Sequence, residues 1–308
     1  MTDNAPSTAA GAPTRAGFVA IVGPTNAGKS TLTNRLVGTK VSIVTQKVQT
    51  TRTRVTGIVT RGTAQIVFVD TPGVFSPRRR LDRAMVAAAW AGAADADLIV
   101  VVVDAERGID DAVEAVCKGL KDSGRKALLA LNKIDLVKRE TLLGLAQAMN
   151  ERIDFDATFM ISASGGAGCD DLMAAIEARL PEGPWLFPED QLSDLPERML
   201  AAEVTREKIY LRLHQELPYS IHVETESWKE QKDGSVRIEQ VIYVERDGQK
   251  AIVLGKRGAT AKIIGSLARE ELEAILGRRV HLFLFVKVRA DWANDRERFA
   301  AMGLDWQE

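Results

Sequence analysis

Five short apolar runs, each closed by a polar cluster, constrain the fold of the first half of this chain more than any other feature. The runs are FVAIV, AQIVFV, LIVVVV, KALLAL and ATFMI, between positions 18 and 161. Their alternation with helix-like segments predicts a mostly parallel α/β sheet with helices on both faces and ligands at the carboxyl ends of the strands. The residues that close the runs should therefore converge in space: Gly23, Asp70, Asp104, Asn132 and Ser162.

The loop after the first run, GPTNAGKST, matches the phosphate-loop pattern between a predicted strand and a predicted helix. Its glycines let backbone N–H groups face phosphate oxygens, and the following helix adds its dipole. We expect Lys29 to reach the β- and γ-phosphates and Ser30 to give an oxygen to Mg²⁺. The nucleotide contacts predicted here are Gly23, Asn26, Ala27, Gly28, Lys29, Ser30 and Thr31.

Two other segments are expected to sense the metal and the γ-phosphate. In DTPG, after the second run, Asp70 can anchor the Mg²⁺ shell and the Gly73 amide can meet the γ-phosphate. The run VSIVTQKVQTTRTR occupies the position of a mobile switch loop, where a threonine closes over Mg²⁺. We predict Thr51, with Thr50 second; the alternative is a simple flexible loop. The predicted metal ligands are Ser30, Asp70 and Thr51.

Residues after the fourth and fifth runs predict that the base is guanine. NKID runs from Asn132 through Lys133 to Asp135, whose carboxylate can accept from N1–H and N2–H₂ of guanine, a donor pair that adenine lacks. In a buried site, an unpaired Asp135 would penalise ATP. SAS offers the Ala163 amide, next to Ser162, to the guanine oxygen. A turn or cap explains any one of these segments, but four in order at successive strand ends predict a site for GTP and GDP.

The residue after DTPG is Val74, where many signalling GTPases carry a glutamine that orients the attacking water. This chain lacks that device, so we expect slow intrinsic hydrolysis. Asn26 offers a substitute, because its side chain can help hold a monovalent cation such as K⁺ beside the phosphates. The alternative is that Asn26 satisfies backbone groups of its own loop. The residues predicted to act in catalysis are Lys29, Asn26, Thr51 and Gly73.

The composition changes near residue 180 and predicts a second module. The segment LPEGPWLFPEDQLSDLPER contains four prolines and divides the 308-residue chain. The net charge of −1 excludes a uniformly basic nucleic-acid coat, so a polyanion site must be a local patch. We expect a disordered tail at 1–16, a GTP-binding domain at 17–181, a linker at 182–198 and an RNA-binding domain at 199–308.

A basic turn, GKRG, lies between two predicted helices, QKAIVL and ATAKIIGSLAREELEAIL. A GxxG turn between helices beside a three-stranded sheet is the KH arrangement, an α+β fold that clamps about four nucleotides of single-stranded nucleic acid. Glycine pairs also end helices without any such function, so the flanking elements and local charge carry the signal. Isoleucines 252, 263 and 264 are interpreted as a floor beneath the bases or, equally, as core. The predicted RNA contacts are Gly255, Lys256, Arg257, Gly258, Lys250, Lys262, Ile252 and Ile263.

The combination resembles the Era family, bacterial ribosome-assembly GTPases of the TrmE-Era-like group that end in a type II KH domain. The segments that carry this resemblance are QTTRTR, ELPYSIHVE, VERDGQKAIVLGKRGATAKIIG and VHLFLFVKVRADWA, and it covers nearly the whole chain from Gly17 on. One departure is the sequence GPTN, where the family usually has proline immediately before the asparagine; Asn26 stays in register.

The resemblance implies binding to the 3′ end of small-subunit ribosomal RNA, RNA affinity set by the GTP state, and a role in late maturation of the small ribosomal subunit. It also implies a cytoplasmic protein with peripheral association at the inner face of the membrane, although the sequence shows neither an anchor nor a transmembrane segment. We expect a monomer. Two other functions stay open: a nucleotide-gated RNA chaperone in which hydrolysis is incidental, and a membrane-associated signalling GTPase whose KH fold serves protein contacts.

Overall fold

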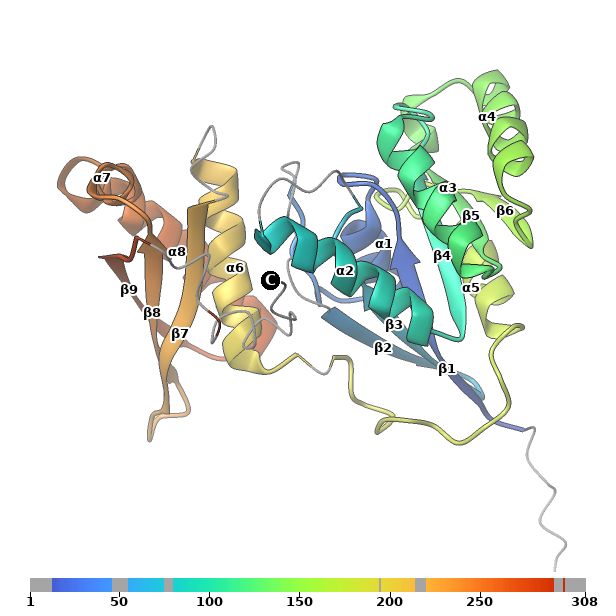
Figure 1. Ribbon diagram of the computed structural model, residues 1–308. Helices are drawn as coiled ribbons and strands as arrows, with labels where there is room; N and C mark the ends of the chain where they lie inside the picture. Colours follow the sequence, from blue (N-terminus) through green and yellow to red (C-terminus); the bar gives the residue numbers. More distant parts are fainter. Residues whose placement is uncertain are drawn as a thin grey trace, which may run out of the picture.

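The structure, a computed structural model, describes residues 13–45, 55–74, 80–193, 195–213, 220–290 and 296. It contains two bodies of secondary structure that follow one another along the chain (Figure 1). The expected fold class, a mostly parallel α/β domain followed by a KH domain, is confirmed. Among these residues we find no helix whose length and apolar content would let it cross a bilayer.

The first body is built on a six-stranded sheet with the strand order β2-β3-β1-β4-β5-β6. All neighbouring strands run parallel except β2, which is antiparallel to β3. β3 and β4 are buried along their whole length, as expected for strands covered on both faces. The five predicted runs fall on five of these strands, and β2 was missed. The strands are β1 (Arg15–Val22), β2 (Val55–Arg61), β3 (Ala64–Asp70), β4 (Leu98–Asp104), β5 (Leu128–Asn132) and β6 (Ala157–Met160).

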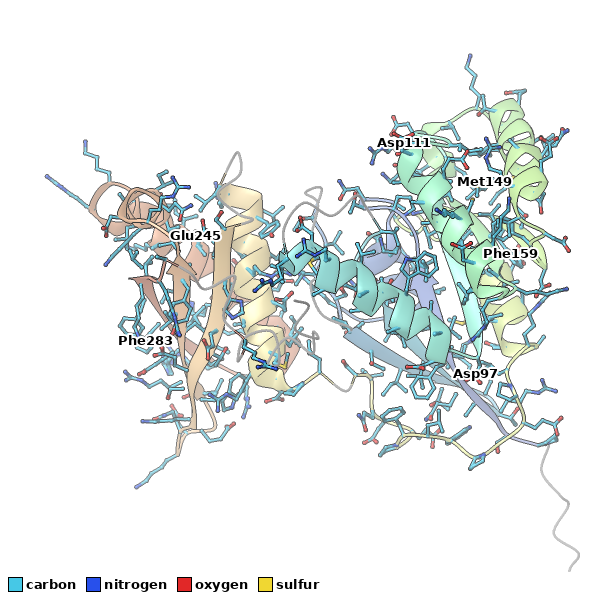
Figure 2. The ribbon with its side chains drawn as sticks, in the orientation of Figure 1. Asp97, Asp111, Met149, Phe159, Glu245 and Phe283 are labelled. Atoms are coloured by element: carbon cyan, nitrogen blue, oxygen red, sulfur yellow. The ribbon has the colours of Figure 1, made fainter. Side chains whose placement is uncertain are left out.

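Helices cover both faces of this sheet. α1 and α5 pack on one face, against alternate residues of β1, β3 and β4. α2, α3 and α4 contribute to the core on the other face, where Met149 of α4 is fully buried (Figure 2). The period of two along the strands thus separates the apolar core into two layers. The helical elements are α1 (Lys29–Val37), α2 (Arg80–Asp95), α3 (Asp111–Ser123), η1 (Ile134–Leu136), α4 (Arg139–Arg152) and α5 (Cys169–Glu177).

The second body is a three-stranded sheet of order β7-β8-β9 with helices packed against one face. β7 and β8 are antiparallel, whereas β8 and β9 are parallel. A parallel pair needs a long crossover, which α7, η3 and α8 provide. The elements are α6 (Glu197–Arg212), β7 (Ile221–Glu230), β8 (Val236–Val244), α7 (Asp247–Leu254), η3 (Lys256–Gly258), α8 (Ala259–Leu276) and β9 (Val280–Val288).

The segment that joins the two bodies is held along the edge of the first sheet. The buried Gln65 side chain accepts the amides of Leu186 and Phe187 at 2.7 and 2.9 Å. Farther along, the Ile58 amide of β2 donates to the Leu192 carbonyl at 2.8 Å. The chain then enters α6, which lies on the side of the second body that faces the first (Figure 1).

Candidate functional site

The loop between β1 and α1 has the backbone shape that a phosphate site requires. Asn26 and Gly28 both have positive φ, at 63° and 96°. A Cβ added to Gly28 would lie 2.2 Å from Asn132 Nδ2, so glycine is required there by space as well as by conformation. The Ala27 carbonyl accepts from that same Asn132 amide group at 2.8 Å. The structure therefore brings the ends of β1 and β5 together, as predicted from the first and fourth apolar runs. Thr31 lies in the first turn of α1.

Lys29 is the buried cation of this loop. Its side chain is 6% exposed, and its Nζ donates to the Gly23 and Pro24 carbonyls at 3.1 and 2.8 Å. Burial lowers the pKa of Lys29 to about 8, and the charge of Asp70 opposes that shift. The lysine is therefore mostly protonated at neutral pH, inside the loop whose backbone would cradle the phosphates.

The end of β3 supplies a carboxylate next to this loop. The fully buried Asp70 accepts through Oδ2 from Ser30 Oγ at 2.7 Å. Gly73 lies so close that an added Cβ would be 2.6 Å from Thr25 Cγ2, and the next amide, at Val74, donates to the Gly23 carbonyl at 3.1 Å. A hydroxyl and a carboxylate in contact are the oxygen donors that Mg²⁺ prefers, so the residues present fit the metal.

The guanine-recognition residues converge at the ends of β5 and β6. Asn132 Oδ1 accepts from the Ala163 amide at 2.9 Å, and Lys133 Nζ pairs with Asp104 at 2.6 Å. The Ala163 amide can therefore donate to the guanine oxygen, as predicted, only by sharing the hydrogen that it already donates to Asn132. The sequence predicts that Asp135 lies in a buried site, but in the structure it is exposed in η1. The free-energy cost of leaving its carboxylate unpaired, which disfavours ATP, therefore arises only when a bound base covers it.

Sequence reasoning missed Arg35, which lies on α1 between the phosphate loop and the guanine loop. Its Nε donates to the Ala163 carbonyl at 3.1 Å, and its guanidinium also contacts the Ser164 carbonyl. The helix that begins with Lys29 therefore also fixes the backbone next to the buried Ser162. An arginine within a helix carries no sequence signal for such a contact, because the loop it holds lies more than 120 residues away.

The structure describes Val74 and Asn26 but not the predicted switch threonine. Thr51 and its alternative Thr50 lie outside the described residues, so their role stays a prediction. Val74 is 3% exposed and packs into the apolar core with α2 and α3. The position that follows DTPG is thus a core position, with no polar group to orient water. Asn26 is half-buried, with its backbone in the left-handed region.

The GKRG turn has an unusual backbone of its own. Gly255, Arg257 and Gly258 all have positive φ, at 69°, 54° and 79°. A left-handed arginine is uncommon and marks a turn with a structural requirement. Lys256 and Arg257 are exposed, so two cationic side chains project from a tight backbone between α7 and α8. This arrangement can place charge against a phosphodiester chain.

The residues around the turn divide into surface and core. Ile252 and Ile263 are 55% and 44% exposed, whereas Ile264 is fully buried in the core of the second body. The prediction of an apolar floor is therefore compatible with the first two residues, and for Ile264 the core alternative is correct. Lys262 is exposed and Lys250 is half-buried.

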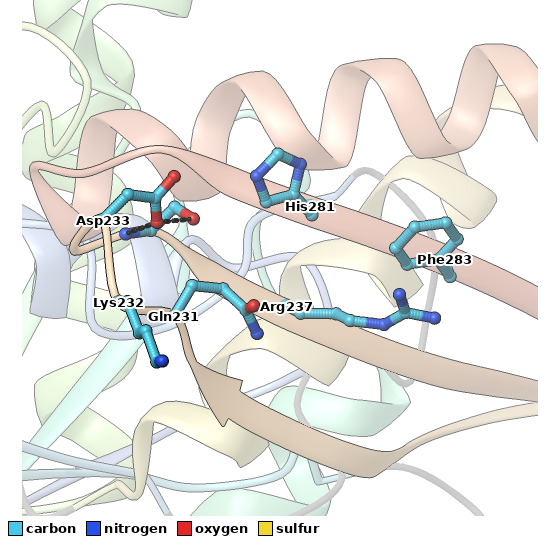
Figure 3. A pocket seen from close by; sticks show the side chains of 7 residues that line it. Gln231, Lys232, Asp233, Arg237, His281 and Phe283 are labelled. Carbon is cyan, nitrogen blue, oxygen red and sulfur yellow. Dashed lines mark hydrogen bonds between the residues drawn. The ribbon is translucent and has the colours of Figure 1, made fainter.

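A separate hollow of about 540 Å³ lies at the β7–β8 turn, at the far end of α8 from the GKRG turn (Figure 3). Lys232, Asp233, Arg237 and Phe283 are among its lining residues. The Arg237 guanidinium stacks on the Phe283 ring at 4.4 Å and pairs with Glu239 at 2.8 Å. Asp233 is engaged by Ser235. Arg237 and Asp233 are thus engaged within the fold, and we assign the hollow no part in function.

Comparison with known families gives independent support for both bodies. A family model described as 50S ribosome-binding GTPase matches residues 18–133, and a KH domain model matches residues 216–293. GTPase Era of Agrobacterium fabrum is 66% identical over 294 residues, which is 96% of this chain and 93% of the relative. GTPase Era of Rhizobium meliloti is 64% identical, over 99% of this chain and 98% of that protein.

Two solved structures share the whole fold. A variant of Aquifex aeolicus Era bound to GDP·AlF₄⁻ superposes with a TM-score of 0.89 at 40% identity, covering 94% of this chain and 99% of that one. Era in complex with MgGDPNP and nucleotides 1506–1542 of 16S ribosomal RNA gives a TM-score of 0.90 at the same identity and coverage. Since the curated relatives match over nearly their full length and the fold agrees throughout, this chain belongs to the Era family of GTPases.

Proposed function

We propose that this GTPase binds the 3′ end of small-subunit ribosomal RNA through its KH domain and acts in assembly of the small ribosomal subunit, with the GTP state setting RNA affinity. The observation that carries the proposal is the 40% identical structure that holds MgGDPNP together with 16S ribosomal RNA. The exposed Lys256 and Arg257 of this chain support it, because they sit on a turn of the KH type.

The residues of the first body support hydrolysis of GTP by positioning and charge. Lys29, protonated at neutral pH, contributes positive charge inside the phosphate loop. Ser30 and Asp70, with Thr51 from the switch run, would hold Mg²⁺, which when bound neutralises charge on the phosphates. Gly73 places a backbone amide close to the loop. Because Val74 is a core residue, the chain lacks a glutamine-type group there, and slow intrinsic turnover follows.

A monovalent cation is the remaining element of the proposed mechanism. Asn26 projects from the left-handed position of the phosphate loop, where its side chain is half-buried. K⁺ held there would add the charge neutralisation that an arginine finger supplies in other GTPases. We also propose a monomer that acts in the cytoplasm and meets the inner membrane face only peripherally.

The test measures GTP hydrolysis of the purified full chain in potassium and in sodium buffer, with and without a short RNA copying the 3′ end of small-subunit ribosomal RNA. We expect the RNA to raise the rate and K⁺ to be required. A double variant, Lys256→Asp with Arg257→Asp, should lose RNA binding and RNA stimulation while GTP affinity stays within about 2-fold of wild type, since the turn lies in the second body. Loss of GTP binding in that variant would contradict the separation of the two sites.

A second candidate function uses the same two sites in a different way. If RNA binds in a nucleotide-dependent manner but leaves the hydrolysis rate unchanged, GTP acts as a gate and the chain is a nucleotide-gated RNA chaperone. The single-stranded clamp geometry of the KH turn is common to both functions, so the effect of RNA on the rate separates them.

A further inference from the structure

The segment from Lys40 to Val44, directly after α1, is built as a rigid piece of the GTPase domain. Val41, Ser42 and Ile43 are each at most 3% exposed. Asn34 of α1 clamps the segment: its Oδ1 accepts the amides of Val41 and Ser42 at 2.9 Å, and its Nδ2 donates to the Ser42 carbonyl at 2.7 Å. A segment held on both its backbone and its side chains can transmit a displacement.

One side of this segment touches the carboxylate of the metal site. Ser42 Oγ donates to Asp70 Oδ2 at 2.7 Å, and the same oxygen accepts from Ser30 Oγ at 2.7 Å. A carboxylate oxygen has two lone pairs, and these two hydroxyls occupy both. Coordination of a nucleotide-bound Mg²⁺ by Ser30 and Asp70 would involve the carboxylate that Ser42 contacts, and it would thereby alter the hydrogen bond from Ser42.

The other side of the segment is tied to the KH domain. Glu207 of α6, which is 4% exposed, accepts the Val44 amide through Oε1 at 2.8 Å and the Lys40 ammonium through Oε2 at 2.6 Å. Lys40 also pairs with Glu271 of α8, the helix that begins at the GKRG turn. Hydrogen bonds that a buried carboxylate accepts are stronger than those between neutral groups. This contact therefore fixes the position of the two domains relative to each other.

We propose that the Lys40–Val44 segment couples the metal-nucleotide site to the RNA-binding domain, and that Glu207 is the residue through which the KH domain takes part. A shift at Ser42 alters the fit of Val44 and Lys40 to Glu207, and through Glu271 it reaches the helix that carries the RNA turn. By linkage, RNA binding changes nucleotide affinity by the same factor that nucleotide changes RNA affinity. The RNA part of this inference rests on the proposed function; the contact between the domains does not.

The experiment measures the dissociation constant for the short 3′-end RNA with the full chain loaded with Mg·GDPNP and with Mg·GDP. In wild type we expect the two constants to differ by about 5-fold or more. In Glu207→Ala, which removes the bonds of α6 to Val44 and Lys40 and leaves only the Lys40–Glu271 pair, the two constants should agree within about 2-fold. Glu207→Gln keeps an acceptor for the Val44 amide but loses the ion pair, so it should restore part of the difference. Lys40→Met removes the pairs with Glu207 and Glu271 but keeps the Val44 bond, so it tests the ion-pair part of the contact from the other domain if the Glu207 variants fold poorly.

Glu226→Gln is the matched control, because Glu226 pairs with Lys287 at 3.0 Å within the KH domain. This variant should keep the wild-type difference. Hydrogen exchange of α6 supplies an arm that does not involve RNA: exchange should respond to Mg·GDPNP in wild type and stop responding in Glu207→Ala. An unchanged α6 response in that variant, or none in wild type, overturns the coupling. If RNA fails to bind in any state while α6 responds as expected, the proposed function fails and the coupling stands.

Discussion

The two glycine loops of this chain differ in what surrounds them. The phosphate loop is closely surrounded by other residues: a Cβ at Gly28 would lie 2.2 Å from the Asn132 side chain, and Lys29 is 6% exposed. The GKRG turn faces outward, with Lys256 and Arg257 exposed and no atom within 4 Å of a Cβ built on Gly258. Both loops use positive φ, but the first is fixed by contacts from distant strands and the second by its own local geometry.

This difference indicates two modes of phosphate recognition. A small ligand of fixed shape is recognised by a preformed, buried loop whose backbone and lysine are held before the ligand arrives. A polymer that must enter and leave is recognised by an open turn that offers charge and close backbone approach. Changes at the first loop should therefore have large effects that depend on packing, whereas a change at the open position Gly258 of the second turn should affect stability only mildly.

The largest contrast is expected between alanine substitutions at Gly28 and Gly258. In Gly28→Ala the new methyl group displaces Asn132, which connects the phosphate loop to the guanine loop, so GTP affinity should fall about 100-fold. In Gly258→Ala the cost is the positive φ alone, about 1 kcal/mol of stability, with GTP affinity unchanged. Fluorescent-nucleotide titration and urea denaturation measure both quantities. Equal losses of GTP affinity in the two variants would remove the contrast.

A second difference concerns the protonation of Lys29. Burial lowers the pKa of Lys29 from 10.5 to about 8. Between these values the unfolded chain keeps a proton that the folded chain has released, so stability rises with pH in that window and is unaffected by this group below it. Relative to Lys29→Met, the free energy of unfolding of wild type should increase by about 2 kcal/mol from pH 8 to pH 10.

Urea denaturation at the two pH values, without nucleotide, checks this expectation. Saturating GDP is the control, because the charge of the phosphates keeps the lysine protonated and should remove the pH-dependent gain. A difference between wild type and Lys29→Met that stays constant from pH 8 to pH 10 would mean that Lys29 is not desolvated in solution.

The sequence predicted the parts of the fold that repeat along the chain. The apolar runs gave five strands of the first sheet, and the polar residues at their ends converge as parallel topology requires. The strand β2 was missed because VTGIVTR contains a glycine and follows a polar run without a turn signal. The run that forms its partner β3 was predicted without β2, so the antiparallel pairing of the two strands depends on the tertiary structure and has no local sequence signal.

The residues missed at the sites are those that act across long sequence separations. Arg35, Ser42 and Glu207 have ordinary neighbours in the sequence, and each acquires its role from a partner in another element. The sequence predicts Glu207 as an exposed polar residue of an amphipathic helix. In the structure it is buried, because Lys40 and Val44 of the other domain pack on it. Motifs report groups that touch a ligand, and they do not report groups that hold those groups in place.

The smallest effect is expected at Arg35, which connects α1, the helix after the phosphate loop, to the guanine loop. Arg35→Ala removes donors to the Ala163 and Ser164 carbonyls, so the affinity for GTP and GDP should fall about 10-fold. Arg35→Lys keeps the charge but cannot span two carbonyls with a planar fork, so it should restore part of that loss. Triphosphates of 2-aminopurine riboside lack the guanine oxygen, and their weaker binding should change less. If both nucleotides lose affinity equally, Arg35 has a general structural role in α1. If only the guanine nucleotide loses affinity, the contact between α1 and the loop at Ala163 also contributes to the choice of base.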